Sequence, residues 1–569
     1  MKLKRAGMVA GALLLTGTLA LTPIASQALP GPTFTVDLRT SGKTYENTFS
    51  NLLAWSNDHW WSTGASSISS SYYSTYYPEL EEVQLLFITG GCYTGYTNPI
   101  TCGPARDPFV DPTDTSTMTD YDFDSIMTGL DNIVRSGLTP YLKIGSQPIK
   151  YSSSPKIGVF GTNTAPPANY TTYYNYLRAL VSRAVTEFGA TEVRSWRWGV
   201  LTEYDNRDQF EHPDGTAAST KVAYFKLYDW SAKALEDELG AGNVKIGAHA
   251  QGNIGGFWDY RELLDHVTTG TNYATGGTGS PMDYMSISFY DNSPTSLTNF
   301  ANTLATLRAK IDAVGLNGLE IGIDEGSMFA PDGDPNGDLS TSFQSALHAW
   351  RYQLATDYDL SWWGRWGLST DGVYSYSEPV IVNPTVTNLG KLVKRMSGSQ
   401  QLAVSYAGTP SDNTNQVGSY SGYDASTDTL YVMVFNRNNS PTSTSSETVE
   451  VNLTNIANSS PVATKFLIDD THSNFFPTWA ANRAAQGYGA SDYRVGASLY
   501  NWLLPDVLTT PAAASYWNSQ KSTYASLSAL NELSASSNVT FTSTTAKITV
   551  TMPPQGVALF KVTGVTPIP

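Results

Sequence analysis

Two glutamates directly follow predicted strands, where a carboxylate is well placed to do chemistry. Glu203 comes after the run at 195–201, in Thr-Glu-Tyr-Asp-Asn, and Glu325 comes after the run at 319–324, in Asp-Glu-Gly-Ser. Two facing carboxyl groups are what glycoside hydrolysis requires: one protonates the leaving oxygen, and the other attacks the anomeric carbon or activates water. These residues indicate that chemistry if the fold brings them together.

The region from about residue 80 to 370 alternates apolar runs of strand length with amphipathic segments of helix length. Predicted strands lie at 49–54, 82–88, 139–144, 195–201, 244–248, 284–289, 319–324 and 360–366. Apolar residues at helical spacing predict helices at 123–134, 173–188, 221–239, 296–314 and 342–354. Eight strand–helix units predict an α/β fold, a (β/α)₈ TIM barrel, because parallel neighbours need helical crossovers. A doubly wound open sheet is the alternative, although no glycine-rich phosphate loop follows the first strands.

The composition and the hydrophobic pattern of the chain change after about residue 390. Ser, Thr and Asn become more frequent, and short alternating segments bounded by turn residues indicate antiparallel strands. We expect a C-terminal β-sandwich domain at 390–569 and a catalytic barrel at 29–389, with the strand at 34–38 joining the sandwich.

Catalytic groups of a (β/α)₈ barrel lie at the C-terminal ends of its strands. Glu203 ends the fourth predicted strand and Glu325 the seventh, so the two carboxyls are expected to face each other across the barrel mouth. Strand alternation allows one of Asp324 and Glu325 to point inward, unless a twist or bulge turns Glu325 toward the interior.

A glutamate at the end of strand four and another at the end of strand seven resembles the clan of retaining barrel glycosidases. With the added sandwich, the chain looks most like glycoside hydrolase family 39, the family of β-xylosidases and α-L-iduronidases. The resemblance implies that Glu203 is the acid/base and Glu325 the nucleophile of a double displacement. In that family Asn usually precedes the acid/base, where it hydrogen-bonds the sugar 2-hydroxyl, and Pro follows it; this chain has Thr202 and Tyr204.

Other strand ends supply candidates for substrate binding. We expect this role for His249, Tyr290, Asn206, Gln147, Trp363 and Trp366. The clan resemblance implies that Tyr290 hydrogen-bonds the nucleophile, and tryptophan rings offer faces on which sugars stack. A buried structural role is the alternative for His249 and for each tryptophan.

An acidic loop follows Glu325 closely. Asp332, Asp334 and Asn336 match the first half of a calcium-binding loop, but the twelfth position is Phe343 instead of Glu. No cofactor is expected, and calcium at this loop is the alternative to an acidic turn without metal.

The N-terminus reads as an export signal. Basic residues at 2–5, an apolar run at 6–20 and small residues at 26 and 28 predict a signal peptide over residues 1–28 and a secreted, extracellular protein. A membrane anchor is the alternative; once the signal is cleaved, no membrane partner is expected. In an oxidising compartment Cys92 and Cys102 are expected to form a disulfide, with a metal pair or a redox dithiol as the alternatives.

The net charge and the composition limit the classes of molecule that the protein is expected to bind. The chain has 34 Lys+Arg against 50 Asp+Glu, a net charge of −16, while 15% of residues are charged and 12% aromatic. This balance argues against nucleic acid, which needs a basic footprint. It suits a carbohydrate substrate, such as polysaccharide side chains with galactose, arabinose or xylose units. The alternative is a non-catalytic carbohydrate-binding or adhesion protein on an inactive barrel.

Overall fold

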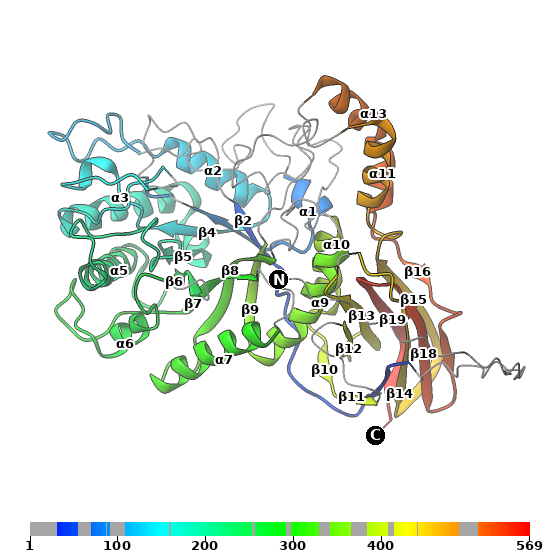
Figure 1. The fold of residues 1–569 in the computed structure, drawn as a ribbon. Helices are drawn as coiled ribbons and strands as arrows, with labels where there is room; N and C mark the ends of the chain where they lie inside the picture. Colours follow the sequence, from blue (N-terminus) through cyan, green and yellow to red (C-terminus); the bar gives the residue numbers. More distant parts are fainter. Residues whose placement is uncertain are drawn as a thin grey trace, which may run out of the picture.

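A closed barrel of parallel strands forms the N-terminal part of the molecule (Figure 1). The computed structural model describes residues 31–568 except 55–69, 87, 91–107, 159–160, 253–255, 292–296, 329–341, 366–383, 408–414, 441 and 489–509. The barrel strands, in order around the barrel, are β2 (Asn51–Ala54), β3 (Glu82–Leu85), β4 (Thr139–Ile144), β5 (Arg197–Val200), β6 (Lys245–Ala250), β7 (Tyr284–Asp291), β8 (Glu320–Met328) and β9 (Leu360–Arg365). The predicted (β/α)₈ fold is confirmed.

Helices alternate with these strands. They are α1 (Tyr72–Tyr76), α2 (Asp124–Arg135), α3 (Tyr170–Phe188), α4 (Ala190–Ser195), α5 (Ala217–Leu239), α6 (Glu262–Thr269), α7 (Leu297–Ala313), α9 (Ser342–Asp357) and α10 (Pro384–Met396). The two longest begin at side-chain caps, Asn169 and Thr216, which accept hydrogen bonds from backbone N–H groups of the first turn. They end at Gly189 and Gly240, whose φ angles of 84° and 91° favour glycine.

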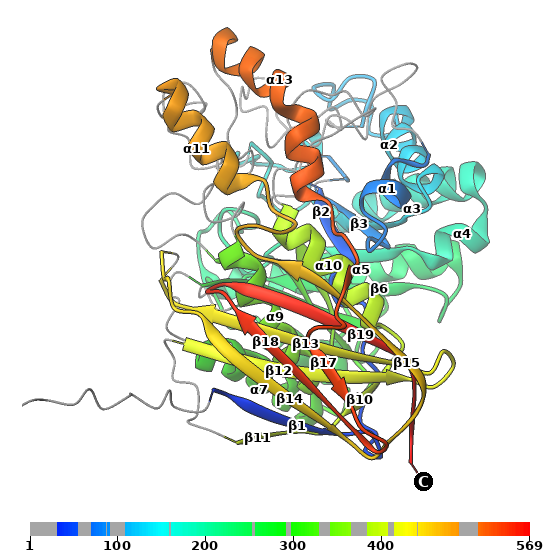
Figure 2. The same cartoon turned by 90° about the vertical axis from the view of Figure 1, so that its right-hand side faces the viewer.

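Two antiparallel-rich sheets form the C-terminal domain (Figure 2). The five-stranded sheet has the order β11 (Val404–Ala407), β1 (Thr33–Asp37), β14 (Glu447–Thr454), β18 (Thr545–Met552), β17 (Val539–Phe541). The six-stranded sheet has the order β10 (Gln400–Leu402), β12 (Asn415–Asp424), β13 (Thr429–Asn438), β19 (Gly556–Pro567), β15 (Ile456–Ile468), β16 (Leu533–Ser534). The first described strand, β1, pairs with β14 and β11, so it belongs to this domain although the barrel strands follow it in the sequence.

The six-stranded sheet is buried on both faces. Along β19, Ala558 and Phe560 face the other sheet, whereas Val557 and Leu559 pack in the same core as the barrel helices α9 and α10. Side chains alternate between the two faces of a strand, so one strand contributes to both cores. The two domains are thereby joined through a continuous apolar interior.

The structure differs from the prediction at two places in the C-terminal half. A boundary at residue 389 divides α10, which ends at Met396, so the sheet domain begins after that helix. Two helices, α11 (Phe476–Gln486) and α13 (Pro511–Ser528), are inserted between β15 and β16 (Figure 2). They pack together through an aromatic cluster whose spacing is helical: Phe475, Trp479, Trp517 and Tyr524.

Several predictions concern residues outside the described ranges. They are the signal peptide, the Cys92–Cys102 pair, Trp366, and the acidic loop with Asp332, Asp334 and Asn336. Where the structure does describe the chain, it holds no helix long and apolar enough to cross a membrane.

Truncation of Leu559 tests the shared core. Leu559→Ala removes a fully buried side chain between the sheet and the barrel helices. We expect a loss of about 2–5 kcal/mol in the free energy of unfolding, measured by urea denaturation, because a cavity is left behind. Lys561→Ala in the same strand is the control and should cost less than about 1 kcal/mol. A Leu559→Ala protein as stable as the control would contradict a continuous core.

Candidate active site

Glu203 and Glu325 both lie at the C-terminal ends of barrel strands, after β5 and within the last part of β8. Both are buried, with 7% and 5% of their surface exposed. The charge of Glu203 raises the pKa of Glu325, so the two carboxyls interact electrostatically. The structure thus brings the two predicted glutamates into one site at the barrel mouth.

A tight turn aims Glu203. Leu201 and Glu203 have φ angles of 63° and 44°, in a region that non-glycine residues rarely adopt. The turn is closed by the Asn206 N–H, which donates to the Glu203 carbonyl at 2.7 Å. It is anchored by Tyr204, whose ring stacks on Tyr224 at 4.3 Å between centroids. Tyr204, which follows Glu203 in the sequence, is therefore part of the aromatic core and holds the strained turn in place.

Two donors hold the Glu203 carboxyl. The Ser288 hydroxyl donates to Oε1 at 2.7 Å, and the Asn206 side-chain amide donates to Oε2 at 2.9 Å. Burial raises the pKa of Glu203, while these two hydrogen bonds lower it. Asn206, predicted to bind sugar, contacts the carboxyl that we expect to carry the proton.

His249 supports Glu203 through Ser288. Its Nε2 lies 2.9 Å from the Ser288 hydroxyl, and its Nδ1 lies 2.8 Å from the Thr202 hydroxyl. Because Ser288 donates to Glu203, its oxygen accepts from His249 Nε2–H, and Thr202 then donates to Nδ1. Burial lowers the pKa of His249 to about 3, so the ring is neutral. His249 was expected to hydrogen-bond substrate or the acid/base, with a buried structural role as the alternative; its ring is fully buried and reaches Glu203 through Ser288.

Tyr290 binds Glu325. Its hydroxyl donates to Oε2 at 2.8 Å, the hydrogen bond that the clan resemblance implied. Burial is the main reason why the pKa of Glu325 is raised, with the Glu203 charge second; Tyr290 and the positive charge of Lys143 lower it. Two carboxyls that interact this closely titrate as a pair, and the positive charge of Lys143 favours the ionised form of Glu325.

A buried ion pair between Lys143 and Asp324 lies next to Glu325, and the sequence analysis did not identify it as part of the site. Asp324 and Glu325 are consecutive, yet both point into the barrel because β8 has a bulge: Ile323 pairs with Ile287, and Glu325 pairs with Ser288. Strand alternation alone would turn only one of the two inward, and the bulge that the sequence analysis named as the exception is present.

Trp363, predicted to offer an aromatic face to the sugar, does not point into the candidate site. Its ring is buried outside the strands, against Phe49, Phe300 and His348, and its Nε1 donates to the Gly326 carbonyl at 3.2 Å. The assignment to the substrate site was wrong, because alternation along β9 turns the neighbouring tryptophan, Trp362, inward instead.

Gln147 is also held by the protein. Its side-chain amide donates to the Gly145 carbonyl at 2.6 Å, and only 1% of the residue is exposed. The structure places it in the loop after β4, where its side-chain oxygen has no hydrogen-bond partner among the described residues, and its role in binding sugar stays a prediction.

A cleft of about 480 Å³ opens beside Glu203. Its lining includes Asn206, Gln251, Arg207, Lys156 and Phe257. Arg207 lies over the Phe257 ring at 4.6 Å, and both cations in the wall pair with Glu211. The cleft thus offers polar groups and an aromatic face with little net charge.

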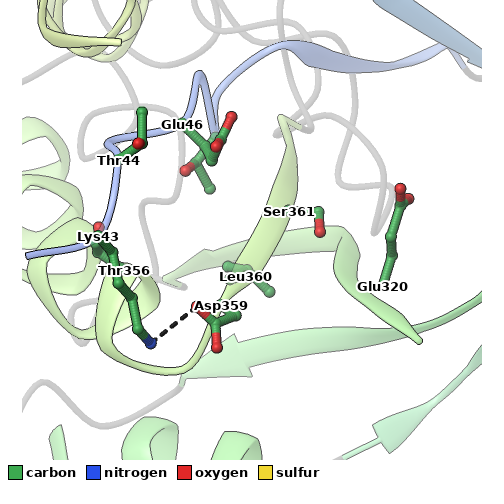
Figure 3. Close-up of a pocket in the computed structure, with 9 residues that line it drawn as sticks. Lys43, Thr44, Glu46, Glu320, Thr356, Asp359, Leu360 and Ser361 are labelled. Atoms are coloured by element: carbon green, nitrogen blue, oxygen red, sulfur yellow. Dashed lines mark ion pairs between the residues drawn. The ribbon is translucent and has the colours of Figure 1, made fainter. Parts of the chain in front are cut away.

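A second hollow, of about 610 Å³, lies at the opposite end of the barrel (Figure 3). Glu320 and Leu360, the first residues of β8 and β9, line it, and Lys43 forms an ion pair with Asp359 at 2.8 Å on its wall. Since Glu203 and Glu325 lie at the other ends of the strands, this hollow is separate from the candidate site.

Within the described ranges, no group of three or more His, Cys, Asp or Glu side chains is arranged to hold a metal ion. Calcium at the acidic loop stays an alternative, because that loop lies outside those ranges.

Comparison with known proteins places the chain near one family. Residues 110–314 match the family model of Glycosyl hydrolases family 39, a stretch that contains Glu203 and ends before Glu325. A β-xylosidase of Caldicellulosiruptor saccharolyticus is 26% identical over 181 residues, 31% of this chain and 32% of that protein. A β-xylosidase of Geobacillus stearothermophilus is 26% identical over 117 residues, 20% of this chain and 22% of that protein. The match thus spans about a third or less of these relatives' lengths.

Solved structures agree over nearly the whole chain. The GH39 enzyme from Xanthomonas axonopodis pv. citri has a TM-score of 0.64 at 13% identity, covering 95% of this chain and 99% of that one. A monomeric β-xylosidase from Caulobacter crescentus has a TM-score of 0.60 at 15% identity, covering 93% and 99%. At such identities these structures support the barrel and the β-rich domain. The resemblance predicted from the two glutamates is confirmed: in its barrel, this chain is similar to the glycosyl hydrolases of family 39.

Proposed function

We propose that this protein is a retaining glycoside hydrolase, with Glu203 as the acid/base and Glu325 as the nucleophile. The observation that carries the proposal is the pair of buried, electrostatically coupled carboxyls after β5 and in β8, each held by protein donors. The local match to family 39 around Glu203 supports it.

In the first step the ionised Glu325 attacks the anomeric carbon while Glu203 protonates the departing oxygen, so the glycosidic bond breaks and a glycosyl ester forms. Tyr290 occupies Oε2 of Glu325, which leaves Oε1 for the attack. Asn206, which donates to Glu203, also lines the cleft, so we assign the proton transfer to the Glu203 carboxyl on that side of the site. In the second step Glu203 takes a proton from water, and the water oxygen replaces Glu325 on the anomeric carbon.

The cleft beside Glu203 is the place for the leaving group. Its cations are paired with Glu211, and its aromatic face comes from Phe257, so it suits an uncharged sugar. We therefore propose side chains of plant-type or microbial polysaccharides, with galactose, arabinose or xylose units, as substrates.

Glutamine substitutions test the two roles. We expect Glu325→Gln to lower kcat by at least about 10³-fold on nitrophenyl glycosides of these sugars, and Glu203→Gln by about 10²–10⁴-fold. The Glu203→Gln loss should shrink with dinitrophenyl glycosides, whose leaving oxygen needs less protonation. Glu320→Gln, at the other end of β8, should stay within about twofold of the unmodified protein. Near-normal turnover by Glu325→Gln would sink the assignment, and sugar binding without turnover by the unmodified protein would favour the non-catalytic alternative.

The stereochemical outcome tests the mechanism independently. NMR of a reaction on an active nitrophenyl glycoside should show the first-formed sugar with the anomeric configuration of the substrate, since two displacements invert twice. First-formed product of the opposite configuration would contradict Glu325 as a nucleophile.

The acid/base assignment also predicts a pH effect. Ser288 donates to Glu203 and thereby lowers its pKa, so Ser288→Ala should raise that pKa. Because Glu203 must be protonated to act as the acid, the basic limb of the kcat/KM profile should move to higher pH. The measurement is the pH profile of kcat/KM for Ser288→Ala and for the unmodified protein. A basic limb that moves to lower pH in the variant would contradict the assignment.

We further propose that the protein is secreted, with residues 1–28 removed and Cys92 bonded to Cys102. The basic and apolar pattern of the N-terminus supports export. Mass spectrometry of protein from the culture medium should give a chain that begins at Leu29 and lacks free thiols. A chain that retains the first 28 residues would contradict the proposal.

A further inference from the structure

Lys143 on β4 and Asp324 on β8 form an ion pair in the barrel interior, and Asp324 directly precedes Glu325. The two side chains are 1% and 0% exposed. Three more donors meet the Asp324 carboxylate: the hydroxyls of Tyr141 and Ser286 contact Oδ2 at 2.7 and 2.6 Å, and the indole N–H of Trp362 contacts Oδ1 at 2.7 Å. The carboxylate is thereby tied to β4, β7 and β9.

The backbone is built around the same residue. Asp324 is the extra residue of the bulge, since its neighbours on both sides pair with consecutive residues of β7. Its carbonyl accepts from the Gln84 amide at 3.3 Å, and a Cβ on Gly364 would lie 2.1 Å from that carbonyl oxygen. The bulge therefore requires glycine on β9, and it turns two consecutive side chains inward.

We propose that the Lys143–Asp324 pair positions the nucleophile: the inward anchoring of Asp324 fixes the bulge, and the bulge aims Glu325 at the anomeric carbon. The inference rests on the proposed function. Lys143 and Asp324 are positioning residues, since neither touches the reacting atoms.

The charges of the pair also act on Glu325. The positive charge of Lys143 lowers the pKa of Glu325, and the negative charge of Asp324 raises it. The other titratable groups around Glu325 and the pair are Glu203, Tyr290, Tyr141, Tyr284, His249 and Arg197. The ring of His249 is neutral, and Arg197 is paired with Glu82 and Glu320. Burial and the Glu203 charge raise the pKa of Glu325 most, and Lys143 and Asp324 shift this raised pKa in opposite directions.

Two single variants should shift the acid limb of kcat/KM in opposite directions. Lys143→Met removes the positive charge, raises the pKa of Glu325 and moves the limb to higher pH by about 0.5–1 unit. Asp324→Asn removes the negative charge and moves it to lower pH by a similar amount. Lys245→Met, an exposed lysine at the start of β6, is the control and should leave the limb in place. An acid limb of kcat/KM that is unchanged in Lys143→Met and Asp324→Asn, or that moves in the same direction in both, would overturn the proposal.

The double variant Lys143→Met/Asp324→Asn separates positioning from mere stability. It leaves no unpaired buried charge, so its thermal midpoint should lie closer to that of the unmodified protein than either single variant does. We expect kcat to remain at least about 10-fold low with KM changed less than about twofold, because the nucleophile is no longer held. Recovery of kcat together with stability would show a purely structural pair. If the single variants do not fold, the double variant decides by this same readout.

A measurement without turnover keeps the two proposals apart. Carbon-13 NMR of glutamate-labelled protein, with Glu325→Gln to assign the resonance, follows the titration of Glu325 itself. The pKa of Glu325 should rise in Lys143→Met and fall in Asp324→Asn. If no glycoside is hydrolysed by the unmodified protein, the proposed function fails while this titration still tests the pair. An unchanged Glu325 titration overturns the pair's role even in an active enzyme.

Discussion

The buried side chains of Glu203, Glu325, Asp324 and Lys143 lie inside the barrel near the C-terminal ends of its strands. A buried charge is costly unless it is paired and hydrogen-bonded. Removing one partner of a buried ion pair costs about 3–5 kcal/mol. The interior of the barrel is arranged to meet this constraint, and despite burial Lys143 and the surrounding donors hold the pKa of Asp324 at about 2.

Strand β7 shows how the constraint is met by ordinary strand geometry. Ser286 and Ser288 are two residues apart, so both face the interior. Ser286 donates to Asp324, and Ser288 donates to Glu203. One strand thus serves both the ion pair and the acid/base, while His249 on β6 connects Ser288 to Thr202. The two hydrogen-bonded groups lie side by side along β7, and the charges of Glu203 and Asp324 both raise the pKa of Glu325.

The fold could be predicted because it depends on periodicity. Eight apolar runs, with helical spacing between them, identify the barrel strands, and the predicted runs coincide with β2–β9. The two glutamates could be predicted because strand ends are where barrels place chemistry. Trp363 was misassigned, since position near a strand end does not say which way a side chain points. The α11 and α13 helices were missed because the region was assigned to a β-sandwich from its composition. The helical spacing of Trp479 and Trp517 from their aromatic neighbours would have indicated them.

The ion pair illustrates a different limit. A lysine in the buried run Thr139–Ile144 and two serines in Tyr284–Asp291 were visible signals, because polar residues within apolar strands need partners inside the barrel. A bulge near Asp324 was considered from the sequence, but the contacts that accommodate it had no such signal: Gly364 and Gln84 come from two other strands and approach the backbone only in the closed barrel. Pairing between distant strands decides it.

The residues around Glu203 bear on how the sugar is recognised. The resemblance to family 39 implies an asparagine before the acid/base that binds the sugar 2-hydroxyl, but here Thr202 takes that place and its hydroxyl is engaged by His249. Tyr204, in place of proline, is engaged by the stack with Tyr224 and donates to the Tyr260 carbonyl at 2.9 Å. Both positions are therefore committed to holding the strained turn. In the proposed mechanism, a sugar 2-hydroxyl is therefore recognised by side chains at the barrel mouth other than Thr202 and Tyr204.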